Sequence, residues 1–269
     1  MSSREVRAST TFMAVPMAWA GGLIVLLVLL IGLFIPHLRS VTWNNRWAFP
    51  ATVAALALFC FVIAGFKSGF DKDHRQSNHL LYGLNADIQE AVWASADTQG
   101  DEWTGQFFAS GSSQGTLADF FPLSRRVYRK AAAPAGSFAG PEVKVLEDTT
   151  ENGMRRLRLR ILSPRGAARL SGQTQSAVSS AALDGKQLIR NSFDGPSNLL
   201  GFIYFALPQE GIELALETKP SQPITLRVVD ESYGLPTLPG ATYRSRPEHM
   251  MPAPLLRTDC ILVGKSYTF

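Results

Sequence analysis

The sequence predicts a two-helix transmembrane hairpin followed by an all-β domain of the β-sandwich, jelly-roll or immunoglobulin-like type. Two uncharged apolar runs, residues 12–35 and 47–66, predict the hairpin. As helices, both are long enough to cross a hydrocarbon core of about 30 Å. Short strand signals separated by turn residues, with no long amphipathic helix after residue 70, predict the β domain.

This interpretation divides the chain into four segments. An N-terminal tail (1–11) precedes the hairpin (12–66), a juxtamembrane linker (67–78) and the β domain (79–269). A loop of ten residues, His37–Arg46, lies between the two apolar runs, so the helices are predicted to be antiparallel neighbours. A cleaved signal peptide is the alternative for the first run. Its apolar segment would be about 7–15 residues long and would end in small residues, which this run does not.

Small residues four positions apart mark one face of each predicted span. Ala18 and Gly22 lie in the first span, and Ala51 and Ala55 lie in the second. Such pairs let helices approach closely in lipid, so these four residues are candidate partner contacts. The alternative is ordinary helix composition.

The strand signals differ in clarity along the β domain. The clearest is Met154–Leu162, MRRLRLRIL, where apolar residues alternate with arginine and predict one buried and one solvated face. Asp184-Gly185 predicts a two-residue hairpin turn between strands at 177–183 and 186–190. The run 202–207 is apolar on both faces, which is typical of a central strand. Further strands are predicted at 80–85, 91–96, 212–217, 224–228 and 259–269, and small-residue loops at 109–115 and 131–140.

The charge of the chain argues against nucleic acid as a partner. Residues 1–66 carry four arginines and one glutamate, and the remainder carries 22 basic and 21 acidic residues. A β domain so nearly balanced lacks the basic surface that binds nucleic acid. Cys60 lies in the second predicted span and Cys260 lies near the C-terminus, so no disulfide is expected between them. The β domain must therefore be stabilised by its own hydrophobic core.

No motif in the sequence predicts a catalytic residue, a metal site or a cofactor. Asp71, Asp73, His74 and His79 form the only compact set of metal-ligand residue types, but their spacing matches no metal motif, and we interpret them as a solvated linker. The chain has no Gly-x-Ser-x-Gly elbow and no glycine-rich phosphate loop.

The arginines of 154–162 are the sharpest charged feature. Arg156, Arg158 and Arg160 are predicted to share one strand face and are candidate contacts for an acidic partner or anionic lipid. The alternative is a solvent face paired across strands, with Glu213 and Glu217 as plausible partners.

Several phrases of the sequence resemble a known family. LLYGLNADIQEAVWAS, DEWTGQFF, LRLRILSPRGAARLS, LRVVDESYGLPTLPG and the terminal KSYTF occur in this order. They resemble the C-terminal region of bacterial membrane-bound zinc aminopeptidases, the M-twenty-eight peptidase family. In that family a peptidase domain precedes membrane spans and an extracytoplasmic β domain.

The resemblance implies an extracytoplasmic β domain but no activity. The zinc ligands of that family belong to the peptidase domain, which this chain lacks, so no catalytic residue is carried over. With two spans, it implies a protein of the bacterial inner membrane with a periplasmic C-terminal domain. The expected function is a non-catalytic accessory subunit that docks onto other integral-membrane subunits, with membrane lipid as a further contact. The host could be a respiratory or photosynthetic complex. The alternatives are the non-catalytic half of a split zinc aminopeptidase, or an independent hydrolase with an unrecognised site.

Overall fold

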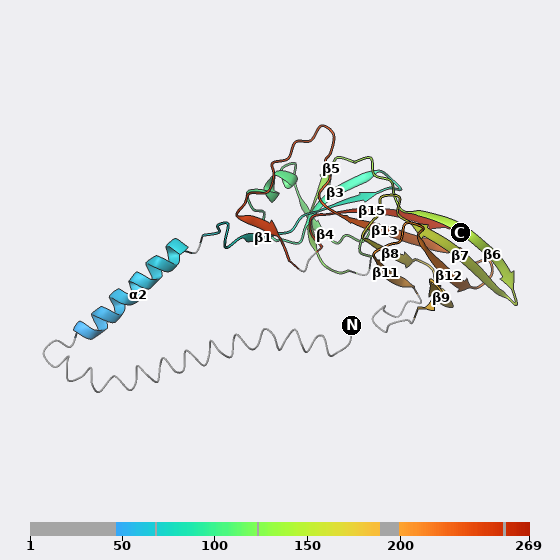
Figure 1. The fold of residues 1–269 in the computed structure, drawn as a ribbon, viewed down its shortest axis with the longest axis horizontal. Coiled ribbons are helices and arrows are strands. Elements are labelled where there is room, and N and C mark those ends of the chain that lie inside the picture. The colour runs from blue at the N-terminus through green and yellow to red at the C-terminus, as the bar shows by residue number, and fades with distance from the viewer. Residues whose placement is uncertain (1–46, 68, 123, 189–198, 255–256) are drawn as a thin grey trace, which may run out of the picture. The chain divides into compact units, whose positions relative to one another are not determined.

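A computed structural model describes residues 47–67, 69–122, 124–188, 199–254 and 257–269 (Figure 1). The chain divides into two compact units, Met1–Gly69 and Phe70–Phe269. In the first unit the described element is helix α2, Ala48–Lys67, and the second unit is built from β-strands.

The predicted transmembrane hairpin is wrong. Among the residues that the structure describes, no helix is long and apolar enough to cross a membrane. The first predicted span, 12–35, lies outside the described residues. The predicted location in a bacterial inner membrane required both spans, so that prediction is wrong as well.

The largest sheet of the second unit has eight strands in the order β11-β8-β13-β15-β2-β3-β5-β4. All neighbouring pairs are antiparallel except β15 and β2, which run parallel. Its strands are β11 (Gly201–Phe205), β8 (Arg169–Thr174), β13 (Thr225–Tyr233), β15 (Cys260–Thr268), β2 (Leu81–Asn85), β3 (Glu90–Ser95), β5 (Tyr128–Ala133) and β4 (Ser113–Gly115).

A second, antiparallel sheet has the order β10-β9-β12-β7-β6. It consists of β10 (Lys186–Gln187), β9 (Ser180–Leu183), β12 (Ile212–Thr218), β7 (Met154–Leu162) and β6 (Glu142–Glu151). The short strands β1 (Gln76–Asn78) and β14 (Met250–Pro252) form a parallel pair, and Thr104–Phe108 forms the 3₁₀ helix η1.

The main core lies between the five-stranded sheet and the β11-β8-β13 end of the eight-stranded sheet. Alternate residues of β7 and β12 supply Leu157, Leu159, Leu214 and Leu216, each at most 1% exposed. Phe202 of β11 and Val228 of β13 join them from the opposite sheet. The period-two pattern of these strands therefore places one side chain in two inside this core.

Two further clusters lie elsewhere on the eight-stranded sheet. One is aromatic and gathers around Trp93 and Tyr82, with Phe107 from η1 and Leu238 from the segment after β13. The other gathers Leu81, Leu262, Val229 and Phe120 on the sheet face that side chains of the main core do not occupy. Two residues of this last cluster, Val229 and Phe120, also line the candidate site described below.

Many of the predicted strands are confirmed, and their boundaries differ by few residues. β7 has the predicted bounds, and the turn at Asp184-Gly185 joins β9 to β10. The loop predictions at 109–115 and 131–140 are partly wrong, because β4 and β5 lie within or across them. The prediction of a central strand at 202–207 is also wrong. β11 forms one end of its sheet, and Ile203 and Phe205 are 51% and 63% exposed.

Candidate functional site

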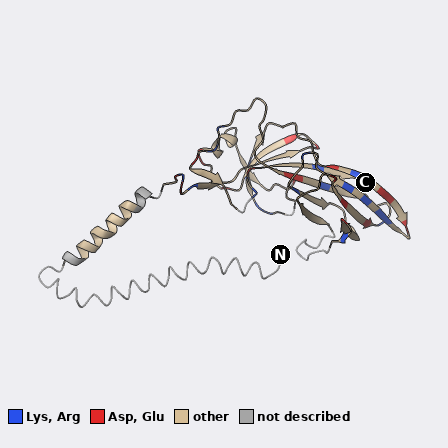
Figure 2. Ribbon diagram, in the orientation of Figure 1, with Lys and Arg blue, Asp and Glu red and all other residues tan. Residues whose placement is uncertain are grey.

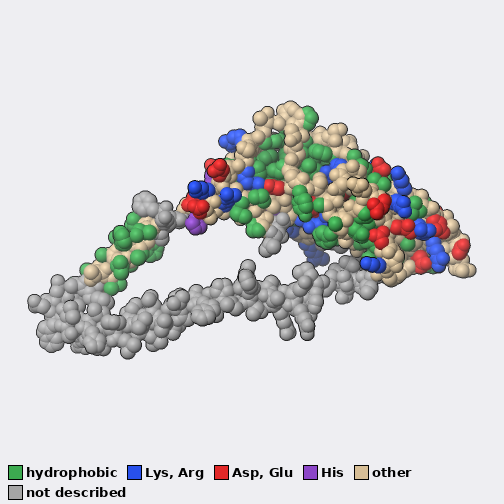
Figure 3. Space-filling model, viewed as in Figure 1, with side chains coloured by type: hydrophobic (Ala, Val, Ile, Leu, Met, Phe, Trp, Pro, Cys, Tyr) green, Lys and Arg blue, Asp and Glu red, His purple; other side chains and the backbone are tan. Residues whose placement is uncertain are grey.

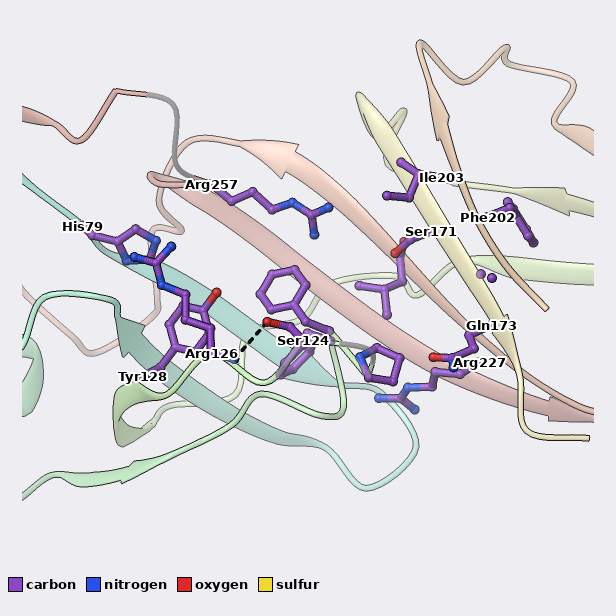
Figure 4. A pocket seen from close by; sticks show the side chains of 16 residues that line it. His79, Ser124, Arg126, Tyr128, Ser171, Gln173, Phe202, Ile203, Arg227 and Arg257 are labelled. Carbon is purple, nitrogen blue, oxygen red and sulfur yellow. Dashed lines mark hydrogen bonds between the residues drawn. The ribbon is translucent and has the colours of Figure 1, made fainter. Parts of the chain in front are cut away.

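A pocket of about 640 Å³ lies on the face of β8, β11 and β13 that is opposite to the main core (Figure 4). Its floor is set by strand register, because Arg227 and Val229 of β13 lie beside Gln173 and Ser171 of β8. Ile203 of β11 lies beside Ser171 on the far side of β8. The volume is in the range of small-molecule or side-chain binding pockets.

The facing wall is a loop before β5, residues 117–122 and 124–127, which we name the pocket loop. Phe120, Phe121 and Pro122 give it an apolar surface, and Ser124 and Arg126 follow them. The amides of Phe120 and Phe121 both donate to the carbonyl of Leu117, which folds the loop into a tight turn.

Arg227 holds the pocket loop to the floor. Its side chain is 8% exposed; its Nε donates to the carbonyl oxygen of Asp119 at 3.1 Å, and its Nη1 is ion-paired with Asp87. A Cβ added at Gly83 would lie 2.6 Å from the Phe120 ring, so only glycine lets the ring lie this close to β2. The pocket loop is therefore bonded to Arg227 of β13 and also packs closely against β2.

Arg257 is the cation best placed to meet a ligand. Its guanidinium projects into the pocket (Figure 4), 4.7 Å from the centre of the Phe121 ring. Its Nε lies 3.6 Å from the Glu231 carboxylate, which also pairs with Arg169 at 3.3 Å. Burial lowers the pKa of the Arg257 guanidinium, and Glu231 opposes that shift. Two arginines thus share one carboxylate, and the described ion pair of Arg257 uses its Nε and leaves its Nη atoms for other contacts.

The pocket lining is positive and largely apolar. Three arginines (Arg126, Arg227 and Arg257) and no acidic residue occur among the described residues that line it. Arg126 is exposed and lies 5.8 Å from the centre of the Tyr128 ring. Burial raises the pKa of Tyr128, and the two arginines Arg126 and Arg257 oppose the shift. This chemistry suits an anionic group attached to an apolar body.

His79 closes one end of the pocket and is held neutral. It is 2% exposed, and its Nδ1 accepts a hydrogen bond of 2.9 Å from the Ala96 amide. Burial lowers the pKa of this imidazole, although Asp97 opposes the shift. The interpretation of His79 as part of a solvated linker is therefore wrong. It is part of the folded domain.

We expect His79 to make the domain less stable in mild acid. The unfolded chain binds a proton near pH 6.5, whereas the native state resists it because the charged ring is buried and Nδ1 is occupied. The free energy of unfolding should therefore fall as the pH drops below about 6.5, by at most about 1.4 kcal/mol per pH unit for this one proton. Urea titrations at pH 5 to 7.5 measure this slope. His79→Gln should flatten it, and an unchanged slope in that variant would contradict the assignment.

The described residues show no arrangement of groups for nucleophilic catalysis at this pocket. No described hydrogen bond joins His79 to a serine or a cysteine. The Cys260 thiol is 1% exposed, and burial raises its pKa to about 12, which disfavours the reactive thiolate. Among the same residues, no group of three or more His, Cys, Asp or Glu is placed to hold a metal ion.

The structure describes two of the four small residues that the sequence predicts as helix contacts. Ala18 and Gly22 are outside the described residues, whereas Ala51 and Ala55 are exposed on α2. No finding tests whether these four residues bind a partner.

The arginine row of β7 is paired across strands, as one of the two sequence interpretations predicted. Arg156 contacts Glu217 at 3.1 Å, and Arg158 contacts Glu213 at 2.7 Å and also Glu147 of β6. Arg160 is exposed and has no carboxylate within ion-pair distance in the described part of the chain. Charges of both signs alternate along β6, β7 and β12 (Figure 2) and intermix on the surface there (Figure 3). This face is therefore close to neutral.

Sequence reasoning missed the residues of the pocket. Arg126, Tyr128, Ile203 and Arg257 come from three distant segments, and none belongs to a motif. One signal was present, because the apolar run at 202–207 is more hydrophobic than an edge strand needs to be.

The comparisons with known proteins add no relative. No protein-family model matches the chain, and no curated protein matches it. The resemblance to the C-terminal region of membrane-bound zinc aminopeptidases stays a prediction.

Proposed function

We propose that the chain is a non-catalytic accessory subunit whose β domain binds a partner by capturing an anionic group in the cationic pocket. One observation carries the proposal. The guanidinium of Arg257 projects into a largely apolar pocket, remains 29% exposed, and meets the Glu231 carboxylate through Nε. A carboxylate or similar group on the partner would supply an acceptor for its Nη donors.

The surroundings of Arg257 favour binding over solvent exposure of this charge. Glu231 and the Phe121 ring fix the guanidinium without consuming its Nη donors. A preorganised cation loses little conformational entropy on binding, and hydrogen bonds between charged groups contribute about 1.5–3 kcal/mol. Phe121, which packs against the guanidinium, and the exposed Ile203 give the same pocket apolar surface.

A small amphiphilic anion tests the pocket directly. Decanoate carries a carboxylate on an apolar tail, and isothermal titration calorimetry measures its affinity for the purified full-length chain. Arg257→Gln should weaken decanoate binding about 10- to 100-fold, because it removes the charged donors but keeps a side chain of similar length. The neutral analogue decanol should bind wild type and variant alike.

Arg125→Gln is the matched control. Arg125 is exposed and is not among the described residues that line the pocket, so this change removes an equal charge from the pocket loop without touching the lining. Decanoate should bind it as tightly as wild type. Equal weakening by both substitutions would point to a general charge effect, and no weakening by Arg257→Gln would overturn the proposal.

A further inference from the structure

Strand β11 offers an unpaired backbone edge directly beside the pocket. It is the end strand of the eight-stranded sheet, and no other described strand pairs with its outer side. The amide of Thr174 donates to the carbonyl of Leu200, and the amide of Ala206 donates to the carbonyl of Ala168. Since bonding alternates along an antiparallel pair, Phe202 and Tyr204 bond to β8. The amide and carbonyl groups of Gly201, Ile203 and Phe205 therefore point outward.

The same three residues face the side of the sheet on which the pocket lies. Ile203 and Phe205 lie beside Ser171 and Arg169 of β8, respectively, and both are more than half exposed. The Arg169 guanidinium lies 4.8 Å from the centre of the Phe205 ring. An edge strand with two large exposed apolar side chains and free backbone groups is normally protected in a monomer. Here it borders a cationic pocket.

We infer that β11 binds an extended, acidic segment of a partner polypeptide, which adds to the sheet as a further strand. This inference rests on the proposed function and names the partner's chemistry. An added strand would run about 4.8 Å from β11, so its pocket-face side chains would lie next to Ile203. Ile203 and Arg257 both line the pocket (Figure 4), so an Asp or Glu beside Ile203 would border a hollow whose described charged lining residues are arginines.

Charge favours an acidic segment over a second copy of this chain. Pairing β11 with itself would bring together the arginines that flank it in both copies, Arg169 and Arg257, around only one Glu231 each. Like charges held close across an interface oppose association, whereas an acidic strand would balance two arginines that share a single carboxylate. A polypeptide strand can form a series of hydrogen bonds with the outward amide and carbonyl groups of β11, whereas a lipid or a small acid cannot.

Selection from a random twelve-residue peptide library against the purified full-length chain tests the inference. The bound peptides should be enriched in Asp or Glu flanked by alternating β-branched or aromatic residues, and depleted in proline. Synthetic copies of the selected peptides, labelled with fluorescein, give dissociation constants by fluorescence anisotropy. Failure of the library to yield acidic, extended peptides would overturn the inference.

Two substitutions at one position separate the backbone from the side chain. Ile203→Pro removes an outward amide without removing a hydrogen bond to β8, a position where edge strands tolerate proline. It should weaken peptide binding about tenfold through the lost backbone hydrogen bond, and Arg257→Gln should weaken it at least as much. Ile203→Val keeps the amide and should bind within about twofold of wild type. Peptide binding unaffected by Ile203→Pro would overturn the added strand.

Hydrogen exchange gives a readout that does not depend on a variant folding well. In the wild-type chain, a selected peptide should slow exchange of the Ile203 and Phe205 amides, and no slowing would overturn the inference. Decanoate distinguishes the two proposals. If it still binds through Arg257 while no peptide protects β11, the pocket stands and the added strand fails. If light scattering instead shows a dimer that the peptide does not disrupt, the edge is occupied by a second copy and the inference is overturned.

Discussion

Trp93→Ala is expected to lower the free energy of unfolding by about 3–5 kcal/mol, the range for removing a large aromatic side chain from a core. Trp93 is 1% exposed on β3 and lies at the centre of the aromatic cluster. Its ring centre is 4.7 Å from Phe107, 5.1 Å from Tyr82 and 5.5 Å from Tyr243. Its Nε1 also donates to the Tyr243 hydroxyl at 3.3 Å. The loss removes contacts to β2, to η1 and to the segment after β13 together.

Urea denaturation followed by circular dichroism measures this change. Trp47→Ala is the matched control, since Trp47 is 69% exposed at the start of α2 and should change the unfolding free energy by less than about 0.5 kcal/mol. A Trp93→Ala loss under about 1 kcal/mol would mean that this cluster does not stabilise the domain. The near-ultraviolet signal should fall with Trp93 and hardly change with Trp47.

Strands with a regular period of two could be read from the sequence. In β7 and β12 alternate apolar residues are buried in the main core and the arginines or glutamates between them lie outside, as in Leu159 beside Arg158. The turn between β9 and β10 was also predicted from the sequence. Asp184 and Gly185 have φ values of 46° and 74°, the left-handed region that Asp-Gly turns adopt. In both cases the signal is local, because backbone geometry and burial alternate over neighbouring residues.

Position within a sheet could not be read in the same way. The run 202–207 is apolar on both faces and was predicted to be central, yet β11 is an end strand. Whether a strand is central depends on which segments pair with it, and β8 and β13 are distant in the chain. The hairpin prediction was wrong for a related reason. A run without charges predicts burial, whereas the described side chains of α2, at positions 50–63, are exposed.

The candidate site was beyond sequence reasoning because it is assembled by tertiary contacts. Arg257 lies in a connection before β15, whereas Phe121 and Arg126 lie in the pocket loop more than 100 residues earlier. Arginine beside aromatic residues at 125–129 was visible in the sequence, but that pattern occurs on many solvated surfaces. Only the strand register places Ile203 next to the same pocket.

Asp230→Ala is expected to lower the free energy of unfolding by about 3–5 kcal/mol, the range for breaking a buried ion pair by removing one partner. Asp230 is fully buried on β13, and its two carboxylate oxygens accept hydrogen bonds from the Ser163 hydroxyl and from Nη2 of Arg165. Arg165 is itself only 13% exposed. Removing the carboxylate leaves the half-buried Arg165 with the Ser232 hydroxyl as its remaining described hydrogen-bond partner and leaves the Ser163 hydroxyl without this acceptor, in the turn that joins β7 to β8.

Urea denaturation at pH 7 measures the loss, and two further variants show its cause. Asp230→Asn keeps one acceptor oxygen and a similar volume, so it should lose less than Asp230→Ala. Asp119→Ala removes an exposed carboxylate and should change the unfolding free energy by less than about 0.5 kcal/mol. Because the turn 163–166 connects the two sheets that enclose the main core, the Asp230→Ala transition should remain a single cooperative step at lower urea. A loss below about 1 kcal/mol would show that Arg165 reaches solvent without cost when Asp230 is removed.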